Sequence, residues 1–191
     1  MASGNPGKLR EMSRILAEFG LTVVPQAEFA VIDAEETGTT FVENALIKAR
    51  HALAITGLPA IADDSGLAVD ALQGRPGVYS ARYAGEHASD NDNIDKLLDE
   101  LEGVDVPERG ATFHCVACFV TPDDAKPMIA KGEWRGYIAE QRTGEGGFGY
   151  DPVFVDPELG LSAAQLTATQ KNQRSHRGKA LVELSRLLRQ Q

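Results

Sequence analysis

Apolar residues recur every three or four positions in several stretches of the chain, which is the spacing of a helix with one buried face. The first stretch follows Asn5, a good N-cap, with Pro6 at the first helical position, and it ends at Gly20. The capping box from Thr40 to Glu43 predicts a second helix that runs to about residue 56. Two more helices are expected over residues 89–101 and along an apolar stripe near the C-terminus, formed by Ala180, Leu181, Leu184, Leu187 and Leu188.

Apolar runs between these helices predict strands at residues 21–24, 60–62, 67–72, 111–120 and 127–134, the last two as antiparallel neighbours. Helices and strands alternate in the first half and strands are consecutive in the middle, which is typical of an α/β protein with a mixed sheet. The run at 60–62 is followed by Asp63-Asp64-Ser65-Gly66, so we expect these acids at the carboxyl end of a buried strand. Ligands gather at that end in α/β sheets.

Composition narrows the class of protein. With 191 residues and 42% hydrophobic positions, the chain fits one globular domain over 1–191, in one or two lobes. No apolar run reaches the ~20 residues that span a bilayer, no secretion signal opens the chain, and two cysteines make no disulfide scaffold, so a cytoplasmic protein without a membrane partner is expected. The formal net charge of −9 argues against a nucleic-acid partner, and an anionic ligand would need a local basic site.

The segment Ser3-Gly4-Asn5-Pro6-Gly7-Lys8 offers such a site, because it places backbone N–H groups and a lysine at a helix N-terminus. The spacing is not that of a Walker A loop, and Leu9 stands where a metal-holding hydroxyl would be. A plain helix cap with a solvated lysine is the alternative interpretation.

Two adjacent acidic pairs, Glu35-Glu36 and Asp63-Asp64, are candidate metal ligands. Mg²⁺ takes hard oxygen ligands and commonly only one or two carboxylates, with water and phosphate oxygens completing its shell. Successive strand side chains point to opposite faces, so one member of each pair would face a given site. Solvated loop acids are the alternative for both pairs.

Other motifs are less specific. Residues 144–149 match G-x-G-x-x-G, but no helix pattern follows, so we reject a dinucleotide fingerprint. We expect a flexible or tightly turned loop that presents Phe148 and Tyr150 for stacking on a base. Lys171, His176 and Arg177 could bind a keto oxygen or a phosphate, or form a solvated basic turn. We interpret the remaining candidates as structural or surface residues, with a dimer contact left open for the last three: Cys115, Cys118, His51, His87, His114, Tyr79, Arg82 and Tyr83.

Seven ordered blocks together resemble the inosine triphosphate pyrophosphatase family, in its bacterial dITP/XTP branch, over nearly the whole chain. The blocks are Ser3-Gly4-Asn5 with Lys8, Glu35-Glu36-Thr37-Gly38, Phe41-Val42-Glu43-Asn44-Ala45 with Lys48-Ala49, Ala62-Asp63-Asp64-Ser65-Gly66-Leu67, Pro76-Gly77-Val78-Tyr79-Ser80-Ala81-Arg82, Gly147-Phe148-Gly149-Tyr150-Asp151-Pro152 and Ser175-His176-Arg177.

The resemblance implies Mg²⁺-dependent hydrolysis of dITP, ITP and XTP to the monophosphate and pyrophosphate. It also implies an elongated mixed sheet flanked by helices, two lobes around a central cleft, and a homodimer. Asp64 would be the catalytic carboxylate and a metal ligand, with Glu36, or its neighbour Glu35, as the second ligand. The implied substrate-binding residues are Ser3, Gly4, Asn5, Lys8, Lys48, Ser65, Phe148, Gly149, Tyr150, Asp151, Lys171, His176 and Arg177.

Physical chemistry agrees with this assignment. Three lysines and Mg²⁺ neutralise the roughly four charges of a triphosphate, and the reaction needs positioning and charge stabilisation rather than a protein nucleophile. A donor such as Arg177 or His176 aimed at the 6-keto oxygen of hypoxanthine or xanthine would reject the amino group of adenine. Guanine shares that oxygen, so its rejection must involve the 2-amino position.

The chain departs from the family at one place. Family members carry a buried apolar strand before the Ser/Thr-Gly-Asn motif, whereas Met1 and Ala2 alone precede Ser3 here. Either the given sequence starts late or is trimmed, or the protein lacks most of that strand. We expect a shortened first strand and, in the second case, an exposed edge or groove with limited thermal stability or altered oligomerisation. Two alternatives to the purine enzyme are a related pyrophosphatase of modified pyrimidine nucleotides and a nucleotide-binding module without catalysis. The two aromatic and basic blocks near residues 148 and 176 favour the purine enzyme, and Asp64, Glu36 and Lys8 together argue against a pure binder.

Overall fold

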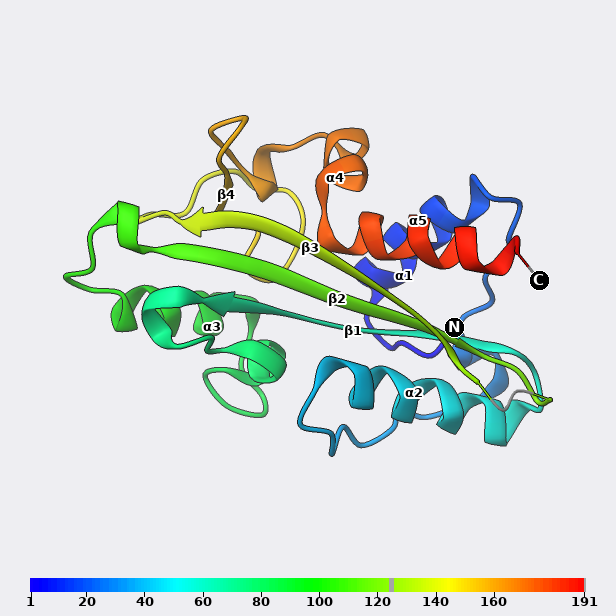
Figure 1. Ribbon diagram of the computed structural model, residues 1–191. Coiled ribbons are helices and arrows are strands. Elements are labelled where there is room, and N and C mark those ends of the chain that lie inside the picture. The colour runs from blue at the N-terminus through cyan, green and yellow to red at the C-terminus, as the bar shows by residue number, and fades with distance from the viewer. Residues whose placement is uncertain (124–125, 191) are drawn as a thin grey trace. The chain divides into compact units, whose positions relative to one another are not determined.

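The computed structural model describes residues 1–123 and 126–190, and it contains five helices and one five-stranded sheet with the strand order β1-β2-β3-β4-β5 within these residues. Figure 1 shows these elements along the chain. The chain divides into two compact units. The first unit comprises Met1–Asp64, Cys115–Gly132 and Ser175–Gln191, and the second comprises Ser65–His114 and Glu133–Arg174.

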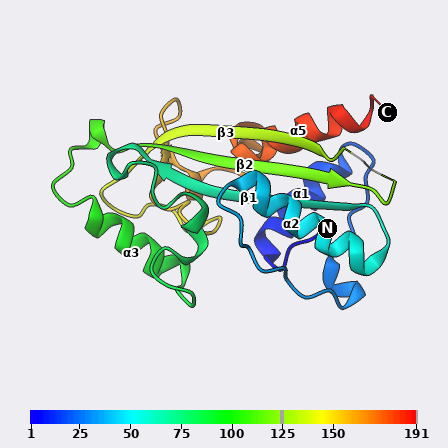
Figure 2. The ribbon, with the colours of Figure 1, turned by 60° about the horizontal axis from the view of Figure 1, so that its bottom comes forward.

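In the first unit, the sheet is covered by helices on both faces. Strands β1 (Ala60–Val69), β2 (Gly110–Val120) and β3 (Met128–Ile138) supply its sheet residues. Alternate residues of a strand point to opposite faces. Accordingly, Val116 and Cys118 of β2 pack with helix α2 (Phe41–Thr56), whereas Cys115 and Ala117 pack with α1 (Pro6–Ala17) and α5 (His176–Leu188) (Figures 1 and 2).

Small residues allow the helices of this unit to approach the sheet closely. The face of α2 toward the sheet carries Ala45, Ala49 and Ala52, all buried. At Gly132 of β3, an added Cβ would lie 2.0 Å from the backbone oxygen of His176. This approach fixes the first turn of α5, which carries the Ser-His-Arg block, against the β3 backbone.

The predicted helix starts are confirmed by their caps, whereas α1 ends at Ala17 and not at the predicted Gly20. The Asn5 side chain accepts the N–H groups of Gly7 and Lys8, at 2.9 and 3.0 Å. Thr40 and Glu43 form a reciprocal capping box, and Gly57 ends α2 with a left-handed φ of 67°. Helices α3 (Asp90–Glu100) and α5 begin at further hydroxyl caps, Ser89 and Ser175.

The second unit has a core of aromatic and aliphatic residues. The Phe154 ring lies 4.5 Å from the Phe113 ring and 4.9 Å from the Trp134 ring, between centroids. Trp134 Nε1 donates to Asp156 at 2.9 Å, which satisfies a buried donor. Its further elements are β4 (Phe154–Asp156), which pairs antiparallel with both β3 and β5 (Leu161–Ser162), and helix α4 (Ala168–Arg174).

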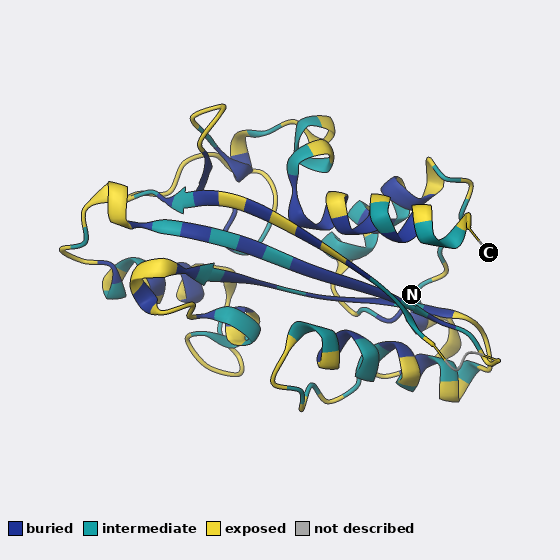
Figure 3. Cartoon of the chain, in the orientation of Figure 1, coloured by how far each residue is buried: buried dark blue, intermediate teal, exposed yellow. Residues whose placement is uncertain are grey.

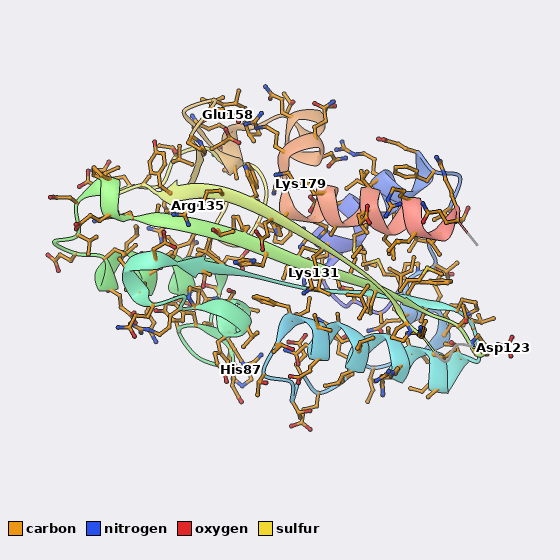
Figure 4. All side chains as sticks on the ribbon, viewed as in Figure 1. His87, Asp123, Lys131, Arg135, Glu158 and Lys179 are labelled. Carbon is orange, nitrogen blue, oxygen red and sulfur yellow. The ribbon has the colours of Figure 1, made fainter. Side chains whose placement is uncertain are left out.

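Strand β3 exposes one of its two faces to solvent. Its residues alternate between buried and exposed from Ala130 to Arg135, as the banding in Figure 3 shows. On the exposed side, Arg135, labelled in Figure 4, bonds to Asp70 and to Thr112. Short 3-10 helices connect the main elements of the described chain, at Gln26–Phe29, Asp70–Leu72, Gly77–Arg82, Val106–Glu108 and Ala163–Gln165.

The prediction that Asp63 and Asp64 follow a strand end is wrong. Strand β1 runs without interruption through both acids, so that they lie in its middle, and it also absorbs the start of the strand expected at 67–72. β3 likewise continues four residues beyond the predicted end at Trp134. Periodicity placed the β1 boundary too early because a strand interior normally excludes buried charges, whereas here the acids have cationic partners.

Two predicted strands near the N-terminus are absent from the described residues. Residues 21–24 have no regular structure, and residues 1–5 form no shortened strand. Ala2 donates one hydrogen bond to Ile61, but the Met1 carbonyl accepts from both Ser3 and Gln26, so the chain turns away from β1. An apolar cavity of about 290 Å³ lies beside this turn, lined in part by Met1, Val23, Phe29, Ile61, Phe119 and Leu188.

Helices and one sheet confirm the α/β class with a sheet flanked by helices. The β3–β4 and β4–β5 strand pairs are antiparallel. Among the described helices, none has the length and apolarity that a bilayer crossing requires. The predicted single domain over 1–191 and its central cleft stay predictions.

Candidate active site

Lys48 joins two of the predicted metal-binding carboxylates. Helix α2 carries its side chain, which is 12% exposed. The Nζ atom lies 2.8 Å from Glu36 Oε1 and 2.9 Å from Asp64 Oδ1. Two acids from different segments, the loop before α2 and the middle of β1, therefore face one cation. We name Glu36, Lys48 and Asp64 the acid–lysine cluster.

Asn44 lies one helical turn before Lys48 and holds the same cluster together. Its Nδ2 donates to Asp64 Oδ2 at 3.3 Å, and its Oδ1 accepts the Gly38 N–H at 2.8 Å. A Cβ at Gly38 would come within 2.6 Å of that Oδ1. The fully buried amide thus ties the loop that carries Glu36 to the strand that carries Asp64. Sequence reasoning missed this residue, although its four-residue spacing from Lys48 places both on one helix face.

Burial and neighbouring charges shift the pKa values of the cluster. Burial lowers the pKa of Lys48, but the carboxylates of Asp64, Asp63 and Glu36 outweigh burial and raise it above its ordinary value. Burial raises the pKa of Asp64, and the Glu36 charge adds to this effect against the opposing Lys48 ammonium. A raised pKa at Asp64 means that its negative charge is incompletely compensated, so a further cation is favoured here.

The donor chemistry of the acid–lysine cluster fits Mg²⁺. Carboxylate oxygens are hard ligands, and Mg²⁺ commonly uses one or two of them. Of the two candidates before α2, Glu36 contacts the cluster, whereas Glu35 is exposed. Within the described residues, no group of three or more His, Cys, Asp or Glu could hold a metal ion without other ligands. A magnesium ion at Glu36 and Asp64 would therefore depend on water and phosphate oxygens.

A second charged cluster occupies the same unit. Asp63 Oδ2 lies 3.3 Å from Lys8 Nζ and 3.4 Å from Arg177 Nε. Arg177 also pairs with Glu11 of α1. Burial lowers the pKa of Arg177, but the Glu11 and Asp63 carboxylates outweigh it and raise the pKa further. Asp63 and Asp64 thus engage different lysines, as alternation along a strand requires.

The loop before α1 is built around a glycine. A Cβ at Gly4 would lie 2.5 Å from Asp33 Oδ2, so a larger residue would displace the Asp33 side chain. Ser3 Oγ accepts the Asn5 N–H at 3.2 Å, and the Asn5 side chain caps the helix. The structure therefore brings Ser3, Gly4 and Asn5 directly before Lys8, at the N-terminal end of a twelve-residue helix.

The second unit gathers another group of the predicted residues. Lys171 forms an ion pair with Asp151, and its Nζ lies 5.1 Å from the centroid of the Phe148 ring. Asp151 also accepts the Phe148 N–H at 2.8 Å. At Gly147, with φ of 78°, a Cβ would lie 2.0 Å from Asp151 Oδ2, which explains the glycine. The tight loop predicted at 144–149 is confirmed.

The remaining predicted residues differ in exposure. Tyr150 is 4% exposed, and its hydroxyl donates to the Ser80 carbonyl, so its ring belongs to the core of the second unit. Burial raises the pKa of this hydroxyl. Ser65, also in the second unit, is partly exposed, Gly149 donates to Asp90, and His176 is buried in the first turn of α5.

The cysteines and other histidines fit the predicted structural roles. Cys115 and Cys118 are buried and unpaired with each other, because they face opposite sides of β2. Burial raises the pKa of Cys118 to about 12, so its thiol is neutral and unreactive at pH 7. His51 and His87 join no metal-binding group within the described part of the chain, and His114 pairs with Glu133.

An α/β fold that holds lysines against paired carboxylates beside a capped, glycine-containing loop is typical of proteins that bind phosphate groups. The chain belongs to the Ham1 family, whose model matches residues 1–187. This match confirms the resemblance drawn from the seven sequence blocks.

Relatives and solved structures agree with the family assignment. The chain is 57% identical over 190 residues to a protein of Pectobacterium atrosepticum named dITP/XTP pyrophosphatase, covering 99% of this chain and 96% of that protein. It is also 57% identical, over 99% of its own length and 94% of the relative, to a Methylococcus capsulatus protein of the same name. A HAM1 protein structure from Coxiella burnetii matches with a TM-score of 0.90 and 50% identity, covering 100% of this chain and 97% of that one. The Ham1 protein of Staphylococcus aureus matches with a TM-score of 0.86 and 44% identity, over 98% and 96% of the two chains.

Proposed function

We propose that this chain is a nucleoside-triphosphate pyrophosphatase that hydrolyses dITP, ITP and XTP to the monophosphate and pyrophosphate, and so removes non-canonical purines from the nucleotide pool. The observation that carries the proposal is the acid–lysine cluster, in which Lys48 lies within 3 Å of both Glu36 and Asp64. The names of the relatives support the choice of substrates.

Glu36 and Asp64 would hold Mg²⁺, which when bound supplies positive charge for the phosphates. Asp64 is the proposed general base, since its carboxylate has a raised pKa and is oriented on both oxygens by Lys48 and Asn44. Lys8 and Lys48 would neutralise the triphosphate, and Ser3, Gly4 and Asn5 would contact it through the loop before α1. No covalent intermediate on the protein is required, because positioning and charge stabilisation lower the barrier to attack by water.

Base recognition is assigned to the residues around the glycine-rich loop and the start of α5. Phe148 offers a ring face, and Gly149, Tyr150 and Asp151 shape the loop around it. Lys171, His176, Arg177 and Ser65 complete the proposed substrate-binding set. A hydrogen-bond donor aimed at the 6-keto oxygen would favour hypoxanthine and xanthine. It would disfavour adenine, because the 6-amino group of adenine is itself a donor.

We further propose that the protein is a homodimer in the cytoplasm and that Mg²⁺ is its cofactor. The tendency of Mg²⁺ to complete its shell with phosphate oxygens supports the cofactor, since only two carboxylates of the cluster are available to it. Size-exclusion chromatography with light scattering tests the dimer, and a monomer over the micromolar range would reject it.

One nucleotide panel tests the function. Pyrophosphate release is measured with dITP, XTP, ITP, dUTP, ATP and GTP, with Mg²⁺ and with a chelator, for the wild type, Asp64→Asn and the exposed control Asp99→Asn. We expect turnover of the three non-canonical purines with Mg²⁺, loss of at least about 100-fold in Asp64→Asn, and no change in the control. Preferential dUTP turnover would favour the pyrimidine enzyme, and binding without turnover would favour the binding module.

A further inference from the structure

Four charged side chains of the first unit form a connected chain of ion pairs, in which Glu11 and Asp63 have no role in the proposed reaction. Lys8 and Glu11 lie three residues apart on α1, Asp63 lies on β1, and Arg177 lies on α5. The contacts run from Glu11 to Arg177, from Arg177 to Asp63 and from Asp63 to Lys8. We name these four residues the Glu11–Lys8 relay.

The middle of the relay is closed to solvent, and its two ends are partly exposed, Lys8 more than Glu11. The side chains of Asp63 and Arg177 are 0% and 2% exposed, that of Glu11 is 11% exposed, and that of Lys8 is 17% exposed. Its two cations and two anions sum to zero charge, which limits the cost of burying them together. Lys8 is the member with the greatest access to a ligand.

Asp63 divides a single carboxylate oxygen between two cations. Its Oδ2 is the atom nearest to both Lys8 Nζ and Arg177 Nε. Because Arg177 takes part of the Asp63 charge, Lys8 is held in place without being fully neutralised. A lysine in that state is ordered before a phosphate arrives and still attracts it.

Glu11 and Asp63 share the Arg177 guanidinium, which contacts both carboxylates. Glu11 Oε2 accepts from Arg177, while Glu11 Oε1 is buried and has no hydrogen-bond partner among the described residues. A change at Glu11 therefore reaches the rest of the relay through Arg177. We propose that Glu11 is a positioning residue that, through Arg177 and Asp63, orders the Lys8 ammonium for the triphosphate.

This inference rests on the proposed function, in which Lys8 binds the triphosphate. The Glu11→Gln variant keeps the size of the side chain but removes its charge, so Arg177 turns more fully to Asp63 and Lys8 loses its fixed counter-ion. We expect KM for dITP to rise about tenfold while kcat changes by less than about threefold, since the side-chain partner of Glu11 is Arg177, which is not a member of the acid–lysine cluster. The matched control is Glu18→Gln, an exposed acid that follows the same helix, and its KM should equal that of the wild type.

A double-variant cycle separates positioning from a general structural role. If Glu11 acts through Lys8, Glu11→Gln adds nothing to the KM of Lys8→Ala, whereas independent effects multiply. Glu11→Asp, which keeps the charge, should recover part of the loss, and circular dichroism at the assay temperature confirms folding. Should Glu11→Gln fail to fold, the cycle is run with Glu11→Asp, whose smaller KM increase must likewise vanish on Lys8→Ala. An equal rise in KM on both backgrounds, or a fall in kcat alone, would overturn the proposal.

Binding of inorganic tripolyphosphate, measured by titration calorimetry, keeps this test separate from the test of function. Loss of affinity in Glu11→Gln on the wild-type background, but not on Lys8→Ala, supports the relay even if the wild type fails to hydrolyse dITP. Hydrolysis of dITP by a wild type whose tripolyphosphate affinity is unchanged by Glu11→Gln would instead reject the relay and leave the proposed function standing.

Discussion

Lys48 Nζ lies 2.9 Å from Asp64 Oδ1, and this ion pair links the second helix to the middle of the first strand. The contact places a cation against the proposed general base before any ligand binds. Glu36 Oε1 lies 2.8 Å from the same Nζ atom. Lys48 therefore contacts the same two carboxylates that would bind a metal ion. Lys48 and a metal ion should therefore compete for the charge of Glu36 and Asp64.

Replacing Lys48 by methionine tests this competition. Without the ammonium, the two carboxylates repel each other and bind a cation more strongly, so Mg²⁺ affinity in the absence of nucleotide should rise severalfold. Turnover of dITP should nevertheless fall at least about 100-fold, because a positive charge for the triphosphate is lost. Titration calorimetry with Mg²⁺ and steady-state kinetics measure the two effects. The exposed control Lys96→Met should change neither, and weaker Mg²⁺ binding in Lys48→Met would contradict this account.

Asn44 is predicted to matter for both stability and turnover. Asn44→Ala leaves the partly exposed Gly38 N–H without its acceptor and the buried Asp64 without one donor. An unsatisfied buried group costs about 1–3 kcal/mol, so the free energy of unfolding should fall by about that amount. We expect kcat to fall about tenfold as Asp64 loses its orientation. Urea unfolding and dITP kinetics measure these changes, and Asn91→Ala, an exposed amide, is the control.

The elements that sequence reasoning placed well are those with local signals. The caps Asn5, Thr40, Ser89 and Ser175 are short-range features, since each side chain bonds to a backbone N–H two or three residues ahead. The acid–lysine cluster was partly predictable for a similar reason. Each of its three members carried a motif, although nothing in the spacing showed that one lysine would bridge Glu36 and Asp64.

Long-range charge pairing explains what sequence reasoning missed. Asp63 and Asp64 lie inside β1 because Lys8, Lys48 and Arg177, from elements distant in sequence, compensate them. Hydrophobic periodicity carries no information on such partners and so ended the strand at residue 62. No local signal marks Glu11 for the same reason, since its partner Arg177 lies 166 residues away.

Asp156 should make stability depend on acid pH. Burial raises its pKa, but hydrogen bonds from Arg174 and Trp134 outweigh burial and hold the pKa below its ordinary value. A lowered folded-state pKa gives stability that is present above the unfolded pKa of about 3.9 and is lost as pH falls through the folded value. Asp156→Asn should therefore be less stable than the wild type by about 2 kcal/mol at pH 7, and the gap should narrow below about pH 4. Urea unfolding at pH 7 and pH 3 measures the gap, and a gap independent of pH would contradict this cause.

Two glycine substitutions separate steric contact from backbone strain. Gly132→Ala places a Cβ 2.0 Å from the His176 carbonyl oxygen, so α5 must move and the protein should lose about 3 kcal/mol or more. Gly160→Ala meets no atom within 4 Å, and only its φ of 63° opposes the change, which costs roughly 1–2 kcal/mol. Thermal unfolding ranks the two, and an equal loss would show that α5 yields easily at its first turn.

The apolar cavity beside Met1 gives the last prediction, which concerns stability. The Met1 ammonium donates to the Val24 carbonyl at 2.7 Å, and its partial burial lowers its pKa. An apolar extension of about four residues before Met1 would turn this charge into an amide and offer side chains to the cavity walls. At about 25 cal/mol per Å² of apolar surface buried, 100–150 Å² would add roughly 3 kcal/mol, and the melting temperature should rise by several degrees.

The control for this extension is a Gly-Ser segment of equal length. It removes the terminal charge equally but brings no apolar surface, so it should recover only a small part of the gain. Differential scanning calorimetry at pH 7 measures both variants against the unextended chain. If the apolar side chains fill the cavity, the apolar extension melts at a higher temperature than the Gly-Ser extension. Equal melting temperatures for the two extensions would mean that burial of apolar surface in the cavity does not stabilise the protein.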